Sequence, residues 1–410
     1  MKRNDCGRVP FLPSFTECAT VSLLSFTILL GSAACSAIPG ASLFSRCDEP
    51  TAEDKAVVDA LFAHPLPKFP QDKKESTQDS LWRLRKEAAA KNGLHVFDPR
   101  ATLDRYSSNL YENNGKNIPL SDYQLMAKEF MARYGVSVIQ PTDVTTYPLR
   151  GIVPLSSATI TESDEFAIKQ NYVTLVRSTA ELPVELVNQI GLTEVIVVKI
   201  ADKTILGRAE TATKTKDFGR FYIDATKPTI SATFHHEIFH LWDANQCTGR
   251  DGIYGDPSFT ELNPDGAATY VGMLAYKAKA EANPSLTVEN TSNSQAAKDV
   301  INEWQIASAK AVFTKEQNAF YTAKYNELFS KAIVHRDYAL SDVAEDKAVN
   351  GEIILWPYYY NYGAHNNNYG ALAPWSSVVR AKSLFLLTRM YQDDPRIVQY
   401  YNYVGNRQAE

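Results

Sequence analysis

The sequence has no run of lysine or arginine, and no apolar segment as long as the ~20 residues that a bilayer-spanning helix needs. Its formal net charge is −5, so it lacks the basic surface that nucleic acid binding requires, and nucleic acid is not an expected partner. Hydrophobic residues make up 44% and charged residues 22% of the chain, as in ordinary globular proteins. Its 410 residues suffice for two domains, or for one large domain with helical additions.

The N-terminus has the pattern of a secretory signal. Basic residues precede an apolar stretch of about a dozen residues that ends at Ser32, and small residues follow it. Residues 1–37 are therefore predicted to be a signal peptide cleaved after Ala34 or Ala37. The mature protein would then be secreted, periplasmic or held at the cell surface. Cleavage before Cys35 by the lipoprotein route is the alternative and would leave a lipid anchor there, although Ser32 stands where that route prefers leucine.

Cysteine is scarce, with five residues in the whole chain. Two of them leave with the signal, and Cys35 is either cleaved off or lipidated. Cys47 and Cys247 then remain as an even pair in an oxidising compartment. They are expected either to form a disulfide or to stay as two buried thiols.

The most informative feature is the sequence His-Glu-Ile-Phe-His at positions 236–240. On a helix, residues i and i+4 share one face, so the imidazoles of His236 and His240 can reach a single metal ion. Glu237 can then act as general base on a water bound to that metal. Two neutral nitrogen ligands, a carboxylate base and an open coordination position describe a catalytic Zn²⁺ site. The alternative is a helix with two histidines that have purely structural partners.

The neighbouring polar residues are expected to have other roles. Asp243 lies one turn beyond His240 and is predicted to hydrogen-bond around the site rather than to bind the metal. His235 points roughly 100° away from His236 and is expected to be an ordinary, partly buried histidine. His335 and His365 could act as donors to the substrate or to its oxyanion, but His335 is more simply predicted to be a solvated residue at a helix end.

Hydrophobic periodicity predicts an α+β protein. The nearly continuous apolar segment 193–200 is expected to be a central strand, and 220–224 a short edge strand directly before the metal-binding helix. Two further strands are predicted at 136–139 and 172–177. Helices are predicted near 52–64 and at 75–91, 121–134, 182–190, 266–282, 295–313, 315–332, 343–355 and 376–390.

This order of elements is the layout of a zincin-like metallopeptidase fold, with a small mixed sheet, an active-site helix and a largely helical C-terminal part. The expected organisation is a signal peptide (1–37), an N-terminal helical region (38–150) and a catalytic domain (151–410). The edge strand would offer its free backbone groups to an extended substrate. The aromatic and asparagine-rich segment 356–375 is predicted to be a long surface loop, either exposed or lining a cleft.

The third metal ligand is left open between two carboxylates. Glu261 follows His240 at a spacing near that of thermolysin-like enzymes, but its surroundings favour a turn. Glu345 lies in the first turns of the helix predicted at 343–355, with Ser341 or Asp342 available as N-cap. Asp256 and Asp265 are weaker alternatives.

Tyr338, followed by Glu345-Asp346-Lys347-Ala348, resembles the Tyr-x6-Glu-x-x-Ala element of the anthrax lethal factor catalytic domain and related secreted gluzincins. The aspartate three residues after the second histidine agrees with that family. The resemblance covers roughly residues 180–350. It implies that His236, His240 and Glu345 are zinc ligands. It also implies that Glu237 is the base and that Tyr338 is a phenol donor to the developing oxyanion.

The sequence therefore predicts a secreted zinc metallopeptidase that hydrolyses peptide bonds of a protein or peptide substrate. A non-catalytic secreted binding protein on a zincin scaffold is the alternative, with segment 356–375 as its recognition surface. The presence of Glu237 argues against that alternative, because a pure binding protein has no need of the base.

Overall fold

A computed structural model describes most of the chain between residues 50 and 407. The described ranges are 50–63, 66–140, 152–153, 160–201, 206–210, 219–229, 231–246, 256–282, 291, 294–355 and 376–407. The predicted signal, all five cysteines and segment 356–375 lie outside them. No helix within these ranges is long and apolar enough to cross a membrane.

The fold is α+β and mostly helical, with one small mixed sheet in the order β1-β3-β5-β4, while β2 pairs with the far end of β3. β1 and β5 run parallel to β3, and β4 runs antiparallel to β5. The strands are β1 (Ser137–Ile139), β2 (Ile152–Val153), β3 (Leu192–Ile200), β4 (Gly207–Glu210) and β5 (Gly219–Asp224).

The central strand is β3, as its apolar sequence predicts. Val195 and Val197 face the main core, whereas Ile196 and Val198 face the other side, where they form a smaller cluster with Tyr222. Both faces of β3 are therefore buried, which explains why its sequence does not alternate between apolar and polar residues.

One strand prediction is wrong, and one correctly predicted strand has another position in the sheet. Segment 172–177 is the middle of helix α8 (Glu162–Ala180), which begins with a capping box between Thr161 and Asp164. Its apolar residues follow a helical period on the buried face, so tertiary packing outweighs their β-branched character. Segment 220–224 does form β5, but this strand is interior. Among the described strands the edge is β4, whose short sequence Gly-Arg-Ala-Glu has no strand pattern.

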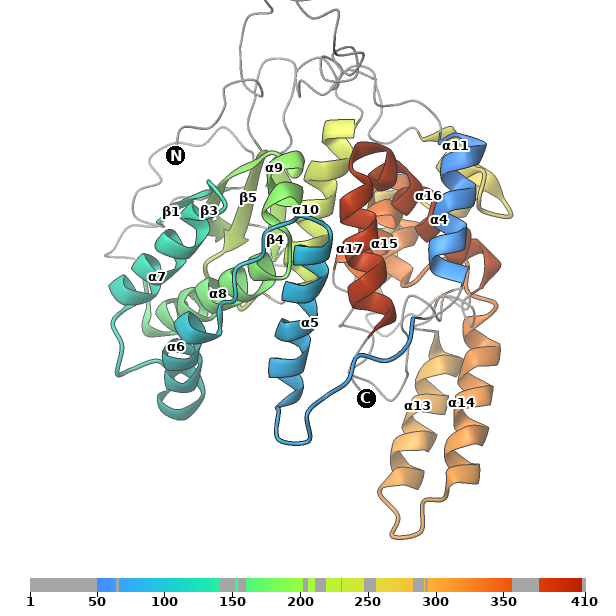
Figure 1. Cartoon of the computed structure of the whole chain (residues 1–410), viewed down its shortest axis with the longest axis horizontal. Coiled ribbons are helices and arrows are strands. Elements are labelled where there is room, and N and C mark those ends of the chain that lie inside the picture. Colours follow the sequence, from blue (N-terminus) through green and yellow to red (C-terminus); the bar gives the residue numbers. More distant parts are fainter. Residues whose placement is uncertain are drawn as a thin grey trace, which may run out of the picture.

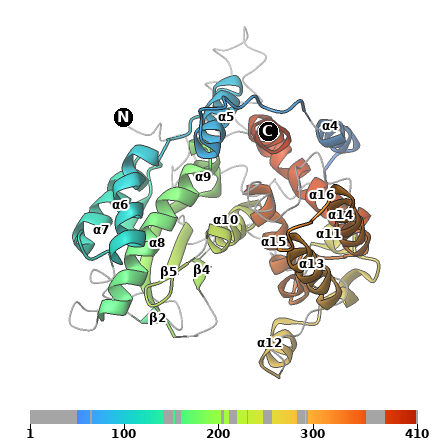
Figure 2. The same ribbon diagram turned by 90° about the horizontal axis from the view of Figure 1, so that it is seen from below.

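The remaining helices lie on both sides of helix α10 (Ser231–Gln246), which is placed between the sheet and the C-terminal helices (Figures 1 and 2). The N-terminal helices are α4 (Ala52–Ala63), α5 (Thr77–Lys91), α6 (Arg100–Asn113), α7 (Leu120–Ala132) and α9 (Val184–Ile190). The C-terminal ones are α11 (Pro257–Thr260), α12 (Met273–Ala282), α13 (Gln295–Ser308), α14 (Lys315–Phe329), α15 (Val343–Leu355), α16 (Ser377–Asp393) and α17 (Pro395–Asn406), with 3-10 turns η3 (Gly266–Thr269) and η4 (Asp337–Leu340).

The helix predicted at 266–282 is interrupted. It consists of η3 and α12, separated at Gly272, whose φ of 84° breaks the helical backbone. α13 and α14 form a hairpin that projects from the body (Figure 1). Helices α6 and α17 were not predicted, although α17 has the local signals of a helix, with Asp394 as N-cap and Pro395 in its first turn.

Candidate metal centre

Helix α10 presents His236 and His240 side by side. Their ring centroids lie 4.8 Å apart with the planes at 89°. Between them, Ile238 is fully buried in the main core on the opposite side of the helix, and Phe239 is buried beside the histidines, so packing fixes the rotation of α10. The two imidazoles are thereby held on the face that looks toward α15.

Glu345 joins the two histidines from the first turn of α15. Its Oε2 lies 2.8 Å from His236 Nε2 and 3.3 Å from His240 Nε2, although the first pair is separated by 109 positions in the chain. The predicted N-cap Asp342 is confirmed, since its Oδ1 accepts the backbone N–H of Glu345 at 3.0 Å. This cap fixes the turn from which Glu345 projects.

The donor atoms of these three residues all lie within 4.8 Å of one another. Ligand atoms at about 2.1 Å from a tetrahedral ion are about 3.4 Å apart, so the spacing fits a single metal ion with small adjustments. Two imidazole nitrogens and one carboxylate leave a fourth position open. Among the described residues this is the one group of such side chains close enough to hold an ion.

The other candidates for the third ligand lie elsewhere. Glu261 is exposed at the C-terminal end of α11, and Asp265 is exposed just before η3. Asp256 is buried, but it caps α11 and forms an ion pair with Arg389 at 2.6 Å. None of the three belongs to the His236–His240–Glu345 group.

The charges at the site stabilise one another in the metal-free protein. Burial alone would lower the pKa of His236, but hydrogen bonding to Glu345 and Glu352 outweighs it and raises this pKa to about 9. Burial likewise opposes ionisation of Glu345, yet the two histidines hold its pKa well below the usual range. A metal ion would therefore replace a proton at this site.

Sequence reasoning missed the second carboxylate beside His236. Glu352 is buried, and its Oε2 lies 3.7 Å from His236 Nδ1 and 2.5 Å from Arg336 Nη2. Arg336 Nη2 also approaches His236 Nδ1, at 3.5 Å. Glu352 and Arg336 thus flank the ring nitrogen that points away from Glu345. The sequence could have indicated this position, because Glu352 follows Glu345 by two helical turns and therefore lies on the same face of α15.

Glu237 contacts the edge of the sheet. Its Oε2 accepts the backbone N–H of Ala209 on β4 at 2.7 Å, so the carboxylate is held at the boundary between the metal site and the edge strand. This contact could not be predicted, because β4 itself was not.

Tyr338 lies on the other side of the histidines. Its ring centroid is 5.8 Å from that of His236, and Tyr276 of α12 packs edge-on against it at 5.6 Å. Burial, together with the charge of Glu345 and hydrogen bonding to it, raises the pKa of Tyr338, so the phenol keeps its proton. The side chain can act as a donor beside the site.

Three polar residues near the site make contacts that hold the fold together and do not belong to the ligand group. His235 is fully buried, with Nδ1 at 2.9 Å from Ser231 O, and is more enclosed than expected. The prediction that His335 is solvated is wrong, since it is 1% exposed. Asp243 makes an ion pair with Lys347 at 2.6 Å rather than contacting a histidine.

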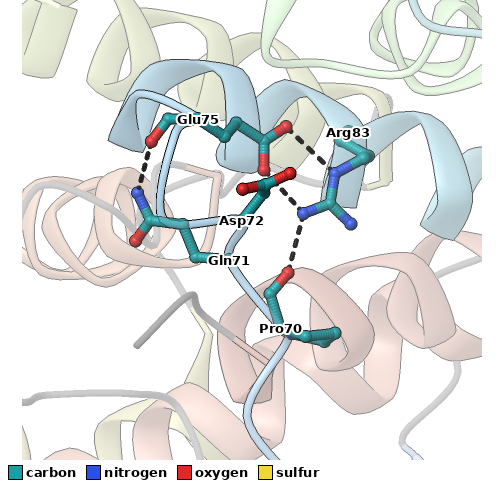
Figure 3. A pocket seen from close by; sticks show the side chains of 5 residues that line it. All are labelled: Pro70, Gln71, Asp72, Glu75 and Arg83. Atoms are coloured by element: carbon teal, nitrogen blue, oxygen red, sulfur yellow. Dashed lines mark hydrogen bonds and ion pairs between the residues drawn. The ribbon is translucent and has the colours of Figure 1, made fainter.

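A separate surface hollow lies near the N-terminal helices (Figure 3). Pro70, Asp72, Glu75 and Arg83 contribute to it. Arg83 donates to both Glu75 oxygens, at 3.0 and 2.7 Å, and these bonds lower the pKa of Glu75 to about 2. The charges neutralise each other, and no metal-binding group lies there among the described residues.

No family model, no curated protein and no solved structure matches this chain.

Proposed function

We propose that this protein is a zinc-dependent peptidase of the gluzincin type, a zincin-like enzyme that works outside the cytoplasm. The observation that carries the proposal is the convergence of His236, His240 and Glu345 from two helices that are far apart in the chain. Placed one residue from His236, Glu237 supplies the carboxylate that a purely structural metal site would not need.

The donor set favours zinc over harder ions. Mg²⁺ and Ca²⁺ prefer a shell made of oxygen ligands, whereas two imidazoles and one carboxylate are the set that catalytic zinc sites use. When bound there, Zn²⁺ would supply Lewis acidity, polarising a carbonyl and lowering the pKa of a coordinated water to about 7.

Side chains of the protein itself would transfer the protons and donate the hydrogen bond that the reaction needs. Glu237 would accept a proton from the attacking water on a carboxylate oxygen and return it to the nitrogen of the leaving amine. Tyr338 would donate its phenol hydrogen bond to the oxygen of the scissile carbonyl as negative charge develops there. Its raised pKa supports this role, because only the protonated phenol is a donor.

The substrate we propose is an extended peptide segment of a protein. β4 is the last strand on its side of the sheet among the described residues, and its Ala209 N–H already points to Glu237. An extended chain that runs beside this edge would bring a peptide bond next to the base.

The test uses the purified mature protein, its metal content measured by mass spectrometry, and a quenched fluorescent peptide library. We expect one zinc per chain and hydrolysis that a chelator abolishes. Glu237→Gln should keep the zinc and lose hydrolysis by roughly a thousandfold or more, because the base acts only on the reaction. Glu261→Gln, which changes an exposed acid, is the matched control and should remain active. Full activity of Glu237→Gln would overturn the mechanism.

A further inference from the structure

A buried chain of alternating charges joins α10 and α15, the two helices that carry the candidate metal ligands. Lys347 Nζ lies 2.6 Å from Asp243 Oδ2 on α10 and 3.7 Å from Asp256 Oδ2. Arg389 of α16 completes the chain, with Nη1 at 2.6 Å from the same Asp256 oxygen. All four side chains are at most 6% exposed. Two acids and two bases thus neutralise each other inside the protein.

The positions of Asp243 and Lys347 relate them to the ligands. Asp243 follows His240 by three residues on α10, and Lys347 follows Glu345 by two residues on α15. A two-residue step turns a helix by about 200°, so Lys347 and Glu345 leave α15 on different sides. On α10, Asp243 is seven residues after His236 and leaves the helix near the same face, about one turn beyond His240, so the Asp243–Lys347 pair joins the same two helices as the ligands further along α10.

We propose that Asp243 and Lys347 are positioning residues that set the distance and rotation between α10 and α15, and thereby preorganise the three ligands. This inference rests on the metal site of the proposed function. An ion pair between two buried groups has a narrow range of favourable geometries, and an unpaired partner would be strongly disfavoured. The pair therefore opposes any sliding of one helix along the other. Because Glu345 is the only ligand from α15, such sliding would move it away from both histidines.

Asp346, the residue before Lys347 on α15, forms a second buried ion pair that can be compared with the Asp243–Lys347 pair. Asp346 makes an equally buried ion pair with Lys382, at 2.6 Å, but this pair ties α15 to α16 and not to α10. A role in stability alone would make the two pairs equivalent. A positioning role would make only the Asp243–Lys347 pair matter to the metal.

The experiment compares the double variants Asp243→Asn/Lys347→Met and Asp346→Asn/Lys382→Met in the full mature chain. Each removes one ion pair without leaving an unpaired buried charge, and Asp256 keeps Arg389 in the first variant. Zinc dissociation constants are measured by competition with a chromophoric chelator. The d–d spectrum of the Co²⁺-loaded protein reports the coordination geometry. Thermal unfolding of the metal-free proteins gives their stability.

We expect both double variants to lose thermal stability. Only Asp243→Asn/Lys347→Met should raise the zinc dissociation constant, by tenfold or more, and change the Co²⁺ spectrum. The single variant Lys347→Met should do the same if it folds. Unchanged zinc affinity and an unchanged spectrum in the first double variant would overturn the positioning role while leaving the proposed function intact. Equal losses of zinc affinity in both double variants would mean that the Asp243–Lys347 pair contributes only to stability, and this would overturn the positioning role. A wild-type protein that binds no zinc would overturn both proposals.

Discussion

Gly351 on α15 lies against the ring of Phe239 on α10 so closely that a Cβ at position 351 would overlap the ring atoms. Phe239 lies between the two histidines of the candidate metal site in the sequence, and Gly351 precedes Glu352. The close approach of α10 and α15 at this point therefore brings the carboxylates of α15 within reach of the imidazoles. Glycine is required here for space and not for a special backbone conformation, since Gly351 is helical.

Gly351→Ala should consequently destabilise the protein, even though alanine favours a helix over glycine by about 1 kcal/mol. The overlap should outweigh that gain and lower the free energy of unfolding by about 1–3 kcal/mol, with a raised zinc dissociation constant as α15 moves away. Urea denaturation and zinc competition measure the two effects. In Phe239→Leu/Gly351→Ala the ring is removed, so the two substitutions should be non-additive, and the double variant should recover part of the zinc affinity. A stabilised Gly351→Ala protein would contradict the packing argument.

The identity of the third ligand gives a second prediction. Glu345→Ala should raise the zinc dissociation constant by roughly a hundredfold or more, because losing a direct ligand costs more than the 10–100-fold typical of supporting residues. Glu261→Ala, at the other carboxylate that sequence spacing suggested, should leave zinc affinity unchanged, since this side chain is exposed and outside the ligand group. A stoichiometric zinc content in Glu345→Ala with unchanged affinity would move the third ligand elsewhere.

Local patterns in the sequence were sufficient to predict the helix that carries His236 and His240, the central strand and the helix that begins at Val343. The spacing of His236 and His240 fixes their common face on any helix, and the cap before Glu345 is a local signal. By contrast, segment 172–177 has the residues of a strand and becomes helical, because the capping box at Thr161 starts a helix that buries them.

The features that could not be predicted from the sequence depend on contacts between segments that are distant in the chain. β4 has no strand pattern, and its role as edge strand comes only from its pairing with β5. Likewise, the ion pair between Asp243 and Lys347 joins residues that local periodicity treats separately. The burial of His335 follows from packing and not from its position after α14.

Zinc binding should release a proton at neutral pH. Without metal, the pKa of His236 is about 9, so the ring is protonated at pH 7.5 and must lose that proton to bind zinc. Calorimetry in buffers of different ionisation enthalpy should give roughly one proton released per zinc at pH 7.5, with apparent affinity still rising up to about pH 9. In Glu352→Gln, which removes one of the carboxylates that raise this pKa, fewer protons should be released. Zinc binding without proton release at pH 7.5 would contradict the charge arrangement at the site.

The buried histidine beside the site should make the protein sensitive to acid. Burial lowers the pKa of His235 to about 3, below its ordinary value of 6.5. Because the unfolded chain binds the proton first, stability is complete above about pH 6.5 and falls as the pH decreases toward 3. By pH 5 the loss from this one residue should be about 2 kcal/mol, at about 1.4 kcal/mol per pH unit. His335, whose pKa burial also lowers, should add to it.

Urea denaturation of the metal-free protein between pH 7 and pH 5 measures this loss. His236 acts in the opposite direction: its pKa is raised in the folded state, so its stabilisation increases slightly as the pH falls from 7, is complete below about pH 6.5 and is lost as the pH rises toward 9. Because the wild type and the His235 variant share this contribution, it does not affect their comparison. His235→Gln stays neutral throughout, so its stability should depend less steeply on pH than that of the wild type. His95→Gln, which changes an exposed histidine paired with Glu185, is the control for the loss of a histidine elsewhere in the chain. Equal slopes in all three proteins would mean that His235 is protonated in the folded state, which its enclosure between α10 and Glu181 does not allow without rearrangement.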